Sequence, residues 1–186
     1  MVTKIENIIA CVFDAYGTLF DVNSAADQCK DVLGDKGDAL SSLWRVRQLE
    51  YTWLRSLMKE YVEFWQITGD GLDYAMEALD IEDIALRERL MNIYMRLDAY
   101  PEVKDVLTKV KAGGFKTAIL SNGSPKMLHS AIENSDIESV LDDCFSVDSI
   151  GVFKPHPSVY QIAVDGLEVE AGRICFMSSN AWDVAA

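Results

Sequence analysis

The 186-residue sequence has no apolar run long enough to cross a membrane. Its longest runs, such as residues 8–13 and 118–120, fall far short of the roughly 20 residues that a membrane helix needs. The first residues show no charged segment followed by an apolar stretch and a cleavage signal, so we expect a cytoplasmic address. Repeats, low-complexity tracts and long linkers are also absent. With 49% hydrophobic residues, the chain can bury a sizeable core, which is typical of a globular protein.

Basic residues are scarce. The chain carries 17 Lys and Arg against 30 Asp and Glu, which gives a formal net charge of −13. Neutralising phosphate groups requires a basic surface, so this charge disfavours nucleic acid and anionic membranes as partners. An anionic substrate would have to be held by a few local cations.

Cysteine pairs at metal-binding or redox spacing are missing too. Cys11, Cys29, Cys144 and Cys175 lie far apart, with no C-x-x-C spacing, and at least two of them stand in apolar, strand-like runs. We therefore predict reduced, buried thiols rather than disulfides or metal ligands.

Four short apolar segments, partly β-branched, predict strands at residues 8–13, 116–121, 145–147 and 173–178. Apolar residues at helical spacing predict helices at residues 101–113, 125–134 and 158–166. Strands that alternate with helices are typical of an α/β fold with a parallel sheet and right-handed crossovers.

Residues 22–99 show a different pattern, with helix after helix and no convincing strand. Apolar side chains recur at steps of about three and four residues, for example through 43–58. We predict an α/β core domain from residues 1–21 and 100–186, and a helical cap subdomain at 22–99. Because ligands of open α/β sheets bind outside the carboxyl ends of the strands, this insertion would act as a lid there.

Polar residues stand at the end of every predicted strand. Asp14 with residues 15–18 follows the first strand, Ser121 and Asn122 the second, Lys154 the third, and residues 178–183 the fourth. Taken singly, such residues are usually turn formers or helix caps. Together, at one edge of a parallel sheet, they predict a functional site.

These strings resemble the haloacid dehalogenase superfamily, and more narrowly its L-2-haloacid dehalogenase branch. The likeness is carried by FDAYGTL (13–19), SNG (121–123), Lys154 with Pro155, and SSNAWD (178–183). LWRVRQLEYTWL (43–54) and EFW (63–65) are similar to the helical cap of the branch. The resemblance implies a Rossmann-like parallel sheet with a cap inserted after the first strand. The chain stops three residues after Asp183, where the family continues, so we expect the last βα unit to be missing.

Two positions depart from the phosphatases of the superfamily. Those enzymes carry an acid two residues after the nucleophile, to protonate a leaving alcohol, and another in the last motif to hold Mg²⁺. Tyr16 and Ser179 stand in these places here. Since a halide leaves without a proton, the resemblance implies a reaction that uses no metal and no cofactor.

The implied reaction is hydrolytic dehalogenation of L-2-haloalkanoic acids to D-2-hydroxy acids. Asp14 would attack C2 and form an ester, while Arg45 with Asn122 receives the halide. Water oriented by Asp183 and Asn180 would then hydrolyse the ester, with Asp183 as the general base.

The resemblance also assigns the supporting residues. Lys154 would keep Asp14 ionised and contact Ser178. The implied catalytic residues are Asp14, Thr18, Arg45, Ser121, Lys154, Tyr160, Ser178, Asn180 and Asp183. The implied substrate contacts are Ala15, Tyr16, Arg45, Leu49, Phe64, Ser121, Asn122 and Trp182, although an aromatic residue such as Phe64 is equally typical of a core. Val46 stands where many relatives have glutamine, so we expect an altered pocket polarity and a changed ranking of short and longer 2-haloacids.

Two other functions remain open. The first is a Mg²⁺-dependent small-molecule phosphatase of the same superfamily, and the second is an inactive, truncated product that serves in binding or assembly. The expected partner is a small 2-haloacid. A homodimer like the family's would suit the aromatic residues of the cap, which could equally belong to the core.

Overall fold

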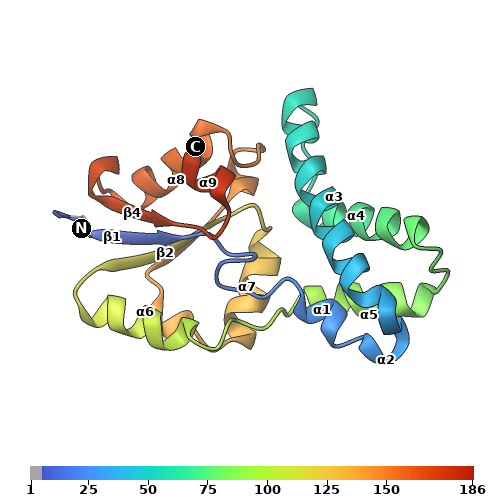
Figure 1. Cartoon of the computed structure of the whole chain (residues 1–186). Helices are drawn as coiled ribbons and strands as arrows, with labels where there is room; N and C mark the ends of the chain where they lie inside the picture. Colours follow the sequence, from blue (N-terminus) through green and yellow to red (C-terminus); the bar gives the residue numbers. More distant parts are fainter. Residues whose placement is uncertain (1–5) are drawn as a thin grey trace.

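The computed structural model describes residues 6–186 and confirms the predicted α/β fold (Figure 1). One parallel sheet has the strand order β3-β2-β1-β4. Its strands are β1 (Ala10–Phe13), β2 (Lys116–Ser121), β3 (Asp143–Ser146) and β4 (Ile174–Met177). The third strand begins two residues before its predicted start at Phe145.

The sheet brings the carboxyl ends of its strands level with one another. Phe13, the last residue of β1, lies beside Ile119 of β2 and Met177 of β4. The Asp14 N–H continues the ladder and donates to the Met177 carbonyl at 2.9 Å. The strand β1 is buried on both faces, which explains its unbroken apolar sequence. Asp14 therefore emerges at the centre of the sheet edge.

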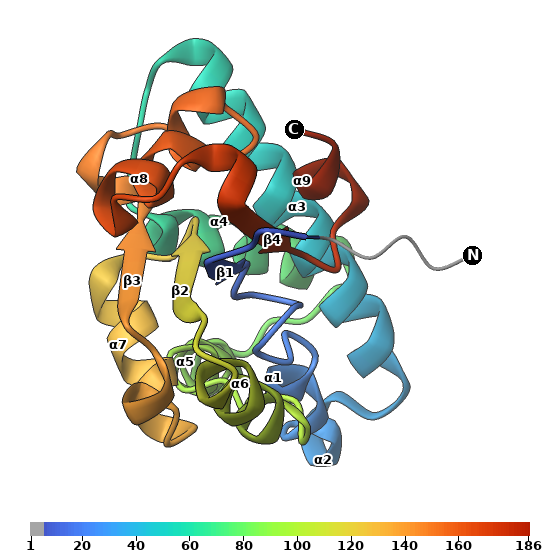
Figure 2. The same cartoon turned by 90° about the vertical axis from the view of Figure 1, so that its left-hand side faces the viewer.

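Helices cover both faces of the sheet (Figure 2). The core helices are α6 (Val103–Ala112), α7 (Pro125–Asn134), α8 (Pro157–Leu167) and α9 (Ala181–Ala185), with 3₁₀ turns η2 (Glu138–Val140), η3 (Val147–Ser149) and η4 (Ala171–Arg173). Both α7 and α8 start with a proline, whose fixed φ suits the first turn of a helix and whose missing N–H has no partner there anyway. Seen along the strands, α6 and α7 lie on one side and α8 on the other.

A second group of helices lies beyond the carboxyl ends of the strands, on the right of Figure 1. It consists of α1 (Ser24–Asp27), α2 (Lys30–Leu33), the turn η1 (Gly34–Lys36), α3 (Gly37–Met58), α4 (Phe64–Ala78) and α5 (Ile84–Tyr94). The two connecting segments run side by side, since the Asp21 N–H donates to the Asp98 carbonyl at 2.8 Å and the Tyr100 N–H to the Leu19 carbonyl at 3.0 Å. The division of the chain at residues 22 and 99 stays a prediction.

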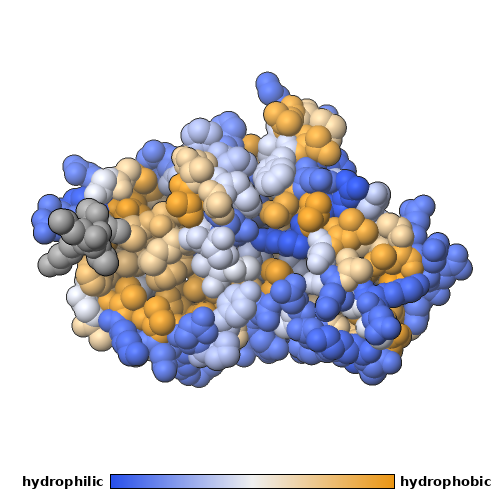
Figure 3. Space-filling view, viewed as in Figure 1, coloured by the Kyte–Doolittle hydropathy of each residue, from blue (hydrophilic) through white to orange (hydrophobic). Residues whose placement is uncertain are grey.

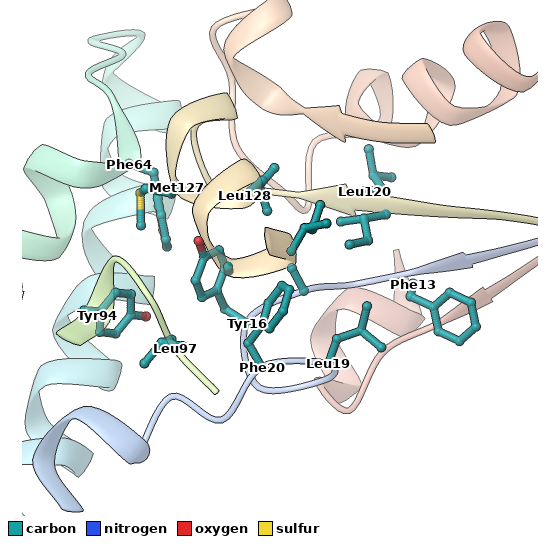
Figure 4. Packing of buried hydrophobic residues seen from close by; sticks show 14 of the residues in the cluster. Phe13, Tyr16, Leu19, Phe20, Phe64, Tyr94, Leu97, Leu120, Met127 and Leu128 are labelled. Carbon is teal, nitrogen blue, oxygen red and sulfur yellow. The ribbon is translucent and has the colours of Figure 1, made fainter. Parts of the chain in front are cut away.

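The hydrophobic core runs without a break from the sheet into this helical group. Figure 4 shows Leu120 near the sheet, Tyr16 and Phe20 beyond it, and Phe64 and Tyr94 from the cap helices. The Tyr16 ring centroid lies 5.7 Å from that of Phe64 and 5.8 Å from that of Tyr94. Aromatic pairs at such distances add about 0.5–1.5 kcal/mol each to the area they bury. The helical group is therefore held to the sheet by apolar packing next to the strand ends.

The strand β4 forms one edge of the described sheet. Its residues pair with β1 and are partly exposed. Apolar surface appears around the strands in Figure 3.

All four cysteines are free thiols in this structure. Cys11 and Cys29 are buried, as predicted, whereas Cys144 and Cys175 are partly exposed. Burial raises the pKa of the Cys144 thiol to about 12, so this group stays protonated at neutral pH. Within residues 6–186, no helix combines the length and apolarity that crossing a membrane requires.

Candidate active site

The Asp14 carboxylate is buried and accepts hydrogen bonds at both oxygens. Oδ2 accepts from Thr18 Oγ1 at 3.0 Å, Asn180 Nδ2 at 3.0 Å and Ser178 Oγ at 3.3 Å. Oδ1 accepts from Lys154 Nζ at 3.1 Å. Since every contact is a donor, the arrangement suits an ionised carboxylate. The loops after β1 and β4 thus converge on one acid, as their sequence positions predicted.

Lys154 joins Asp14 to a second buried acid. Its Nζ lies 3.1 Å from Asp14 Oδ1 and 2.9 Å from Asp183 Oδ2. The side chains of Lys154 and Asp183 are only 1% and 0% exposed. Burying one charge without a partner is costly, so each member of this triad depends on the others.

Tyr160 of α8 holds the other oxygen of Asp183. Its hydroxyl donates to Asp183 Oδ1 at 2.7 Å. The pKa of Tyr160 is raised well above its ordinary value near 10. Burial is the larger cause, and the hydrogen bond to the Asp183 carboxylate is the second. The phenol therefore remains a proton donor over the physiological range.

Among the described residues, no hydrogen bond joins Lys154 to Ser178, although a contact between them was predicted. Ser178 instead donates to Asp14 Oδ2, and its Oγ accepts from the Asn180 N–H at 3.1 Å. The Lys154 ammonium is turned toward the two carboxylates, because these offer it charge as well as acceptors.

Arg45 reaches the strand ends from α3. Its Nη2 donates to the Tyr16 carbonyl at 2.9 Å, and its Nη1 donates to Gln48 Oε1 at 2.9 Å. Arg45 thus contacts Tyr16, which lies 29 positions earlier in the sequence and two residues after Asp14. The lid predicted over Asp14 therefore contributes a cation to the same place.

A narrow cavity of about 10 Å³ lies between the strand ends and the cap helices. Its lining residues come from both parts of the chain: Asp14, Tyr16, Arg45, Leu49, Phe64, Ser121, Asn122, Lys154, Asn180 and Trp182. Phe64 is buried as well as lining, so both of its predicted roles agree with this position. Charged groups and apolar side chains line the same cavity, a combination that is typical of sites for small ligands.

Several predicted residues lie beside the cavity rather than in its wall. Thr18, Ser178, Tyr160 and Asp183 contact Asp14 or one another. Ala15 is fully buried, and its carbonyl accepts the N–H groups that form the turn after Asp14. It is therefore not among the cavity-lining residues, although the sequence placed it among the substrate contacts.

Ser121 and Asn122 line the cavity and also fix the loops. Ser121 Oγ accepts from the Gly123 N–H at 3.0 Å, and Asn122 Oδ1 accepts from the Lys154 N–H at 2.9 Å. Asn122 thereby ties the loop after β2 to the segment that carries Lys154.

Val46 lies on α3 with its side chain outside the site. It is 50% exposed and is not among the residues that line the cavity. The expected change in pocket polarity at this position therefore has no counterpart in this structure.

The polar residues behind Arg45 were not predicted. Gln48, Thr68 and Tyr94 are buried between α3, α4 and α5, and Gln48 hydrogen bonds to each of the other two. Their only signal was the position of Gln48 in the string of residues 43–54, one helical turn after Arg45.

The arrangement can support attack by a carboxylate on carbon. Asp14 supplies a buried nucleophile, Lys154 balances its charge, and Arg45 supplies a second cation in the same small cavity. Asp183 contacts Lys154 beside the cavity and is the carboxylate that could serve as a base for water.

The chain matches the family model of haloacid dehalogenase-like hydrolases over residues 8–186. It belongs to this family. Within the family, the chain is 48% identical to (S)-2-haloacid dehalogenase 4A of Burkholderia cepacia over 97% of its own length and 78% of the relative's. It is 49% identical to (S)-2-haloacid dehalogenase 1 of Pseudomonas sp. (strain CBS-3), over 96% of this chain and 79% of that relative.

Solved structures of family members agree. A dehalogenase with an intermediate complex has a TM-score of 0.95 and 47% identity, over 97% of this chain and 80% of that one. The L-2-haloacid dehalogenase from Xanthobacter autotrophicus with chloropropionic acid covalently bound has a TM-score of 0.88 and 40% identity, over 95% and 72%. This haloacid dehalogenase-like hydrolase therefore lies in the L-2-haloacid dehalogenase branch that its motifs resembled.

Proposed function

We propose that the protein hydrolyses L-2-haloalkanoic acids to D-2-hydroxy acids through an ester on Asp14, without a metal ion. The observation that carries this proposal is the buried Asp14 carboxylate, which has the Lys154 ammonium as its counter-ion and shares its cavity with Arg45. The relatives named for this reaction are 48% and 49% identical to the chain, which supports the same assignment.

In the first step, Asp14 displaces the halide from C2. Oδ2 already accepts three hydrogen bonds, whereas Oδ1 accepts one, from Lys154, so Oδ1 has a free lone pair for the attack. The C2–halogen bond breaks as the ester C–O bond forms, and the configuration at C2 inverts. The departing halide carries the bond electrons and is received by the N–H groups of Arg45 with the Asn122 amide.

In the second step, water attacks the carbonyl carbon of the Asp14 ester. Asp183, assisted by Asn180, orients the water and takes its proton, and the alkoxide of the product leaves with a proton as the hydroxy acid. The support for these roles is that Asp183 lies 2.9 Å from Lys154 Nζ, which also contacts Asp14 Oδ1. The Asp14 carboxylate is then free for another cycle, and one proton is released to solvent for each halide.

Apolar side chains in the lining of the cavity would contact the apolar part of the substrate. Tyr16, Leu49, Phe64 and Trp182 present aromatic and aliphatic surface there, and Trp53 packs edge-on against Trp182 at 5.5 Å between ring centroids. The buried Tyr16 hydroxyl has no hydrogen-bond partner among the described side chains, and burial raises its pKa, so it stays protonated.

The deciding experiment measures halide release from L- and D-2-chloropropionate in EDTA, beside hydrolysis of p-nitrophenyl phosphate with Mg²⁺. We expect halide from the L substrate alone, unaffected by EDTA and abolished by Asp14→Asn. The exposed Asp35 provides the matched control Asp35→Asn, which should behave as wild type. Phosphatase turnover without halide release would instead support the Mg²⁺-dependent alternative, and silence in both assays the non-enzymatic one.

We also infer a homodimer formed through the outer side of α3. Leu54, Leu57 and Met58 are exposed there, Leu57 by 80%, and apolar surface gathers at this end of α3 in Figure 3. Light scattering should give twice the chain mass for wild type and the monomer mass for Leu57→Glu. A monomeric wild type would refute the homodimer but would leave the proposed reaction unaffected.

A cytoplasmic location accords with the free thiols. Cys11 and Cys175 are register partners on neighbouring strands and are unpaired, a state that a reducing compartment maintains.

A further inference from the structure

Three polar side chains are buried behind Arg45, away from the strand ends. Gln48 of α3 is 1% exposed, Thr68 of α4 is 0% exposed and Tyr94 of α5 is 3% exposed. A buried polar group costs stability unless its hydrogen bonds are made. In this cluster, Gln48 hydrogen bonds to Thr68 and Tyr94 on one side and to Arg45 on the other.

The directions of these bonds follow from their donors. Thr68 Oγ1 donates its one proton to the Phe64 carbonyl at 2.8 Å, so it can only accept from Gln48 Nε2, also at 2.8 Å. The amide nitrogen of Gln48 therefore faces Thr68, and its oxygen faces Arg45 Nη1 at 2.9 Å. Arg45, which has only donors, requires the same orientation.

Tyr94 supports the amide from a third side. Its hydroxyl lies 3.1 Å from Gln48 Oε1 and 3.0 Å from Nε2. Its ring stacks on Tyr16 with an interplanar angle of 11°, and Figure 4 shows the two rings side by side. The Tyr16 carbonyl is the other acceptor of Arg45, through Nη2. Tyr94 also hydrogen bonds to the Arg45 side chain, so the cluster reaches the guanidinium through both Gln48 and Tyr94.

We propose that Gln48 is a positioning residue, which holds the Arg45 guanidinium so that its remaining N–H groups face the halide. This inference rests on the proposed function, because it takes Arg45 as the halide-receiving group. Thr68 acts through Gln48 by fixing its amide, and Tyr94 contacts both Gln48 and Arg45. A guanidinium that is held before the substrate binds does not have to be ordered as the carbon–halogen bond breaks.

The first test compares Gln48→Met with wild type. Methionine keeps the length and much of the volume of glutamine but cannot accept the Arg45 hydrogen bond. We expect bromide to bind roughly tenfold more weakly and the Asp14 ester to form roughly tenfold more slowly, as for the loss of a hydrogen bond to a charged group. Hydrolysis of the ester, which does not involve Arg45, should keep its rate. Calorimetric titration with bromide and quenched-flow mass spectrometry of the protein measure the three quantities.

Gln66 supplies the control, because it is an exposed glutamine on α4. Gln66→Met should leave all three quantities unchanged. Tyr94→Phe, which keeps the ring and removes one hydroxyl, should shift bromide binding and ester formation in the same direction as Gln48→Met by a smaller factor. Urea unfolding of each variant shows whether it is folded under the conditions of the binding and rate measurements.

The second test asks whether Gln48 acts through Arg45. If it does, Gln48→Met should have little further effect on bromide binding or ester formation once Arg45 is replaced by lysine, since the Gln48–Arg45 bond is already lost. Equal fold-changes in the wild-type and Arg45→Lys backgrounds would overturn the inference. A slower ester hydrolysis in Gln48→Met would overturn it too, because that result indicates a general disturbance of the site.

The two proposals fail in different ways. A wild type that binds bromide but releases no halide from L-2-chloropropionate would refute the proposed function and leave the difference in bromide affinity as the test of Gln48. An active wild type whose bromide affinity equals that of Gln48→Met, or which binds no bromide, would refute the positioning role alone.

Discussion

The two sides of the cavity are held by different forces. On the sheet side, Asp14, Lys154 and Asp183 form an ionic chain that joins the segments following β1, β3 and β4. On the cap side, Arg45 is held by neutral acceptors, the Tyr16 carbonyl and the Gln48 amide. Ionic contacts in a buried site are strong but depend on every partner, whereas neutral ones can be removed singly. We therefore expect substitutions on the sheet side to abolish dehalogenation. Substitutions on the cap side should reduce its rate only partly.

The largest effect on activity is expected from Asp14→Asn. An amide of the same shape keeps most of the packing but cannot form the ester, so halide release should fall by about 10⁴-fold or more. A halide-selective electrode measures it, and an unchanged circular dichroism spectrum shows that the fold persists. Substantial residual halide release would show that another residue is the nucleophile.

Lys154→Met should combine loss of activity with the largest loss of stability. It leaves the Asp14 and Asp183 carboxylates buried without their counter-ion, which costs about 3–5 kcal/mol in comparable sites. The free energy of unfolding in urea measures the change. Lys126→Met, at an exposed position of α7, is the matched control and should change it by less than about 0.5 kcal/mol. Equal stabilities would show that the ionic chain contributes little.

Tyr160→Phe should slow the second step without greatly affecting the first. Asp183 loses the donor at Oδ1, so water is oriented less well, and ester hydrolysis should fall by roughly 10–100-fold. The Asp14 ester should then accumulate and be visible by mass spectrometry of the intact protein. Because the pKa of Tyr160 is raised, wild type should lose no activity through ionisation of this phenol as the pH rises from 8 to 10.

Gly71→Ala tests how closely the cap helices must pack. A Cβ at this position would lie 3.2 Å from the Gln48 backbone nitrogen and 3.4 Å from Trp44 Cδ1, so α3 and α4 would have to move apart slightly. We expect a loss of about 1–2 kcal/mol in stability and a several-fold slower ester formation. An increase in stability would mean that the helices have room to spare.

Val46→Gln should have the smallest effect. The sequence predicted a changed ranking of short and longer 2-haloacids, but the side chain is half exposed and does not line the cavity. We now expect the ranking of halide-release rates from 2-chloropropionate and 2-chlorobutyrate to stay the same. A reversed ranking would mean that Val46 reaches the substrate in a conformation that differs from this one.

Much of the sheet side was predictable from the sequence. A strand that is buried on both faces reads as an apolar run, so Ala10–Phe13 and the acid that follows it were recognisable. The parallel order then brought Asp14, Lys154 and Asp183 to one edge. The exact partner of Lys154 was not predictable, because Ser178 and Asp183 lie in the same short string, residues 178–183, and only the folded geometry decides between them.

The cap side was predictable only in outline. Helical spacing identified α3 and α4, but Gln48 and Thr68 read as ordinary polar residues of a solvated helix face. Their burial depends on how closely two helices approach at Gly71, which no local pattern reveals. Arg45 was found through the family string and not through any property of its helix.

Lys154 also bears on where such an enzyme can work. Under the proposed function, the positive charge beside the nucleophile is synthesised with the polypeptide, in a fixed ratio of one to each chain. Chelators in the surroundings cannot remove it, competing divalent ions cannot replace it, and dilution cannot strip it from the site. Dehalogenation would then continue in media poor in magnesium, where the metal-dependent members of the superfamily would slow.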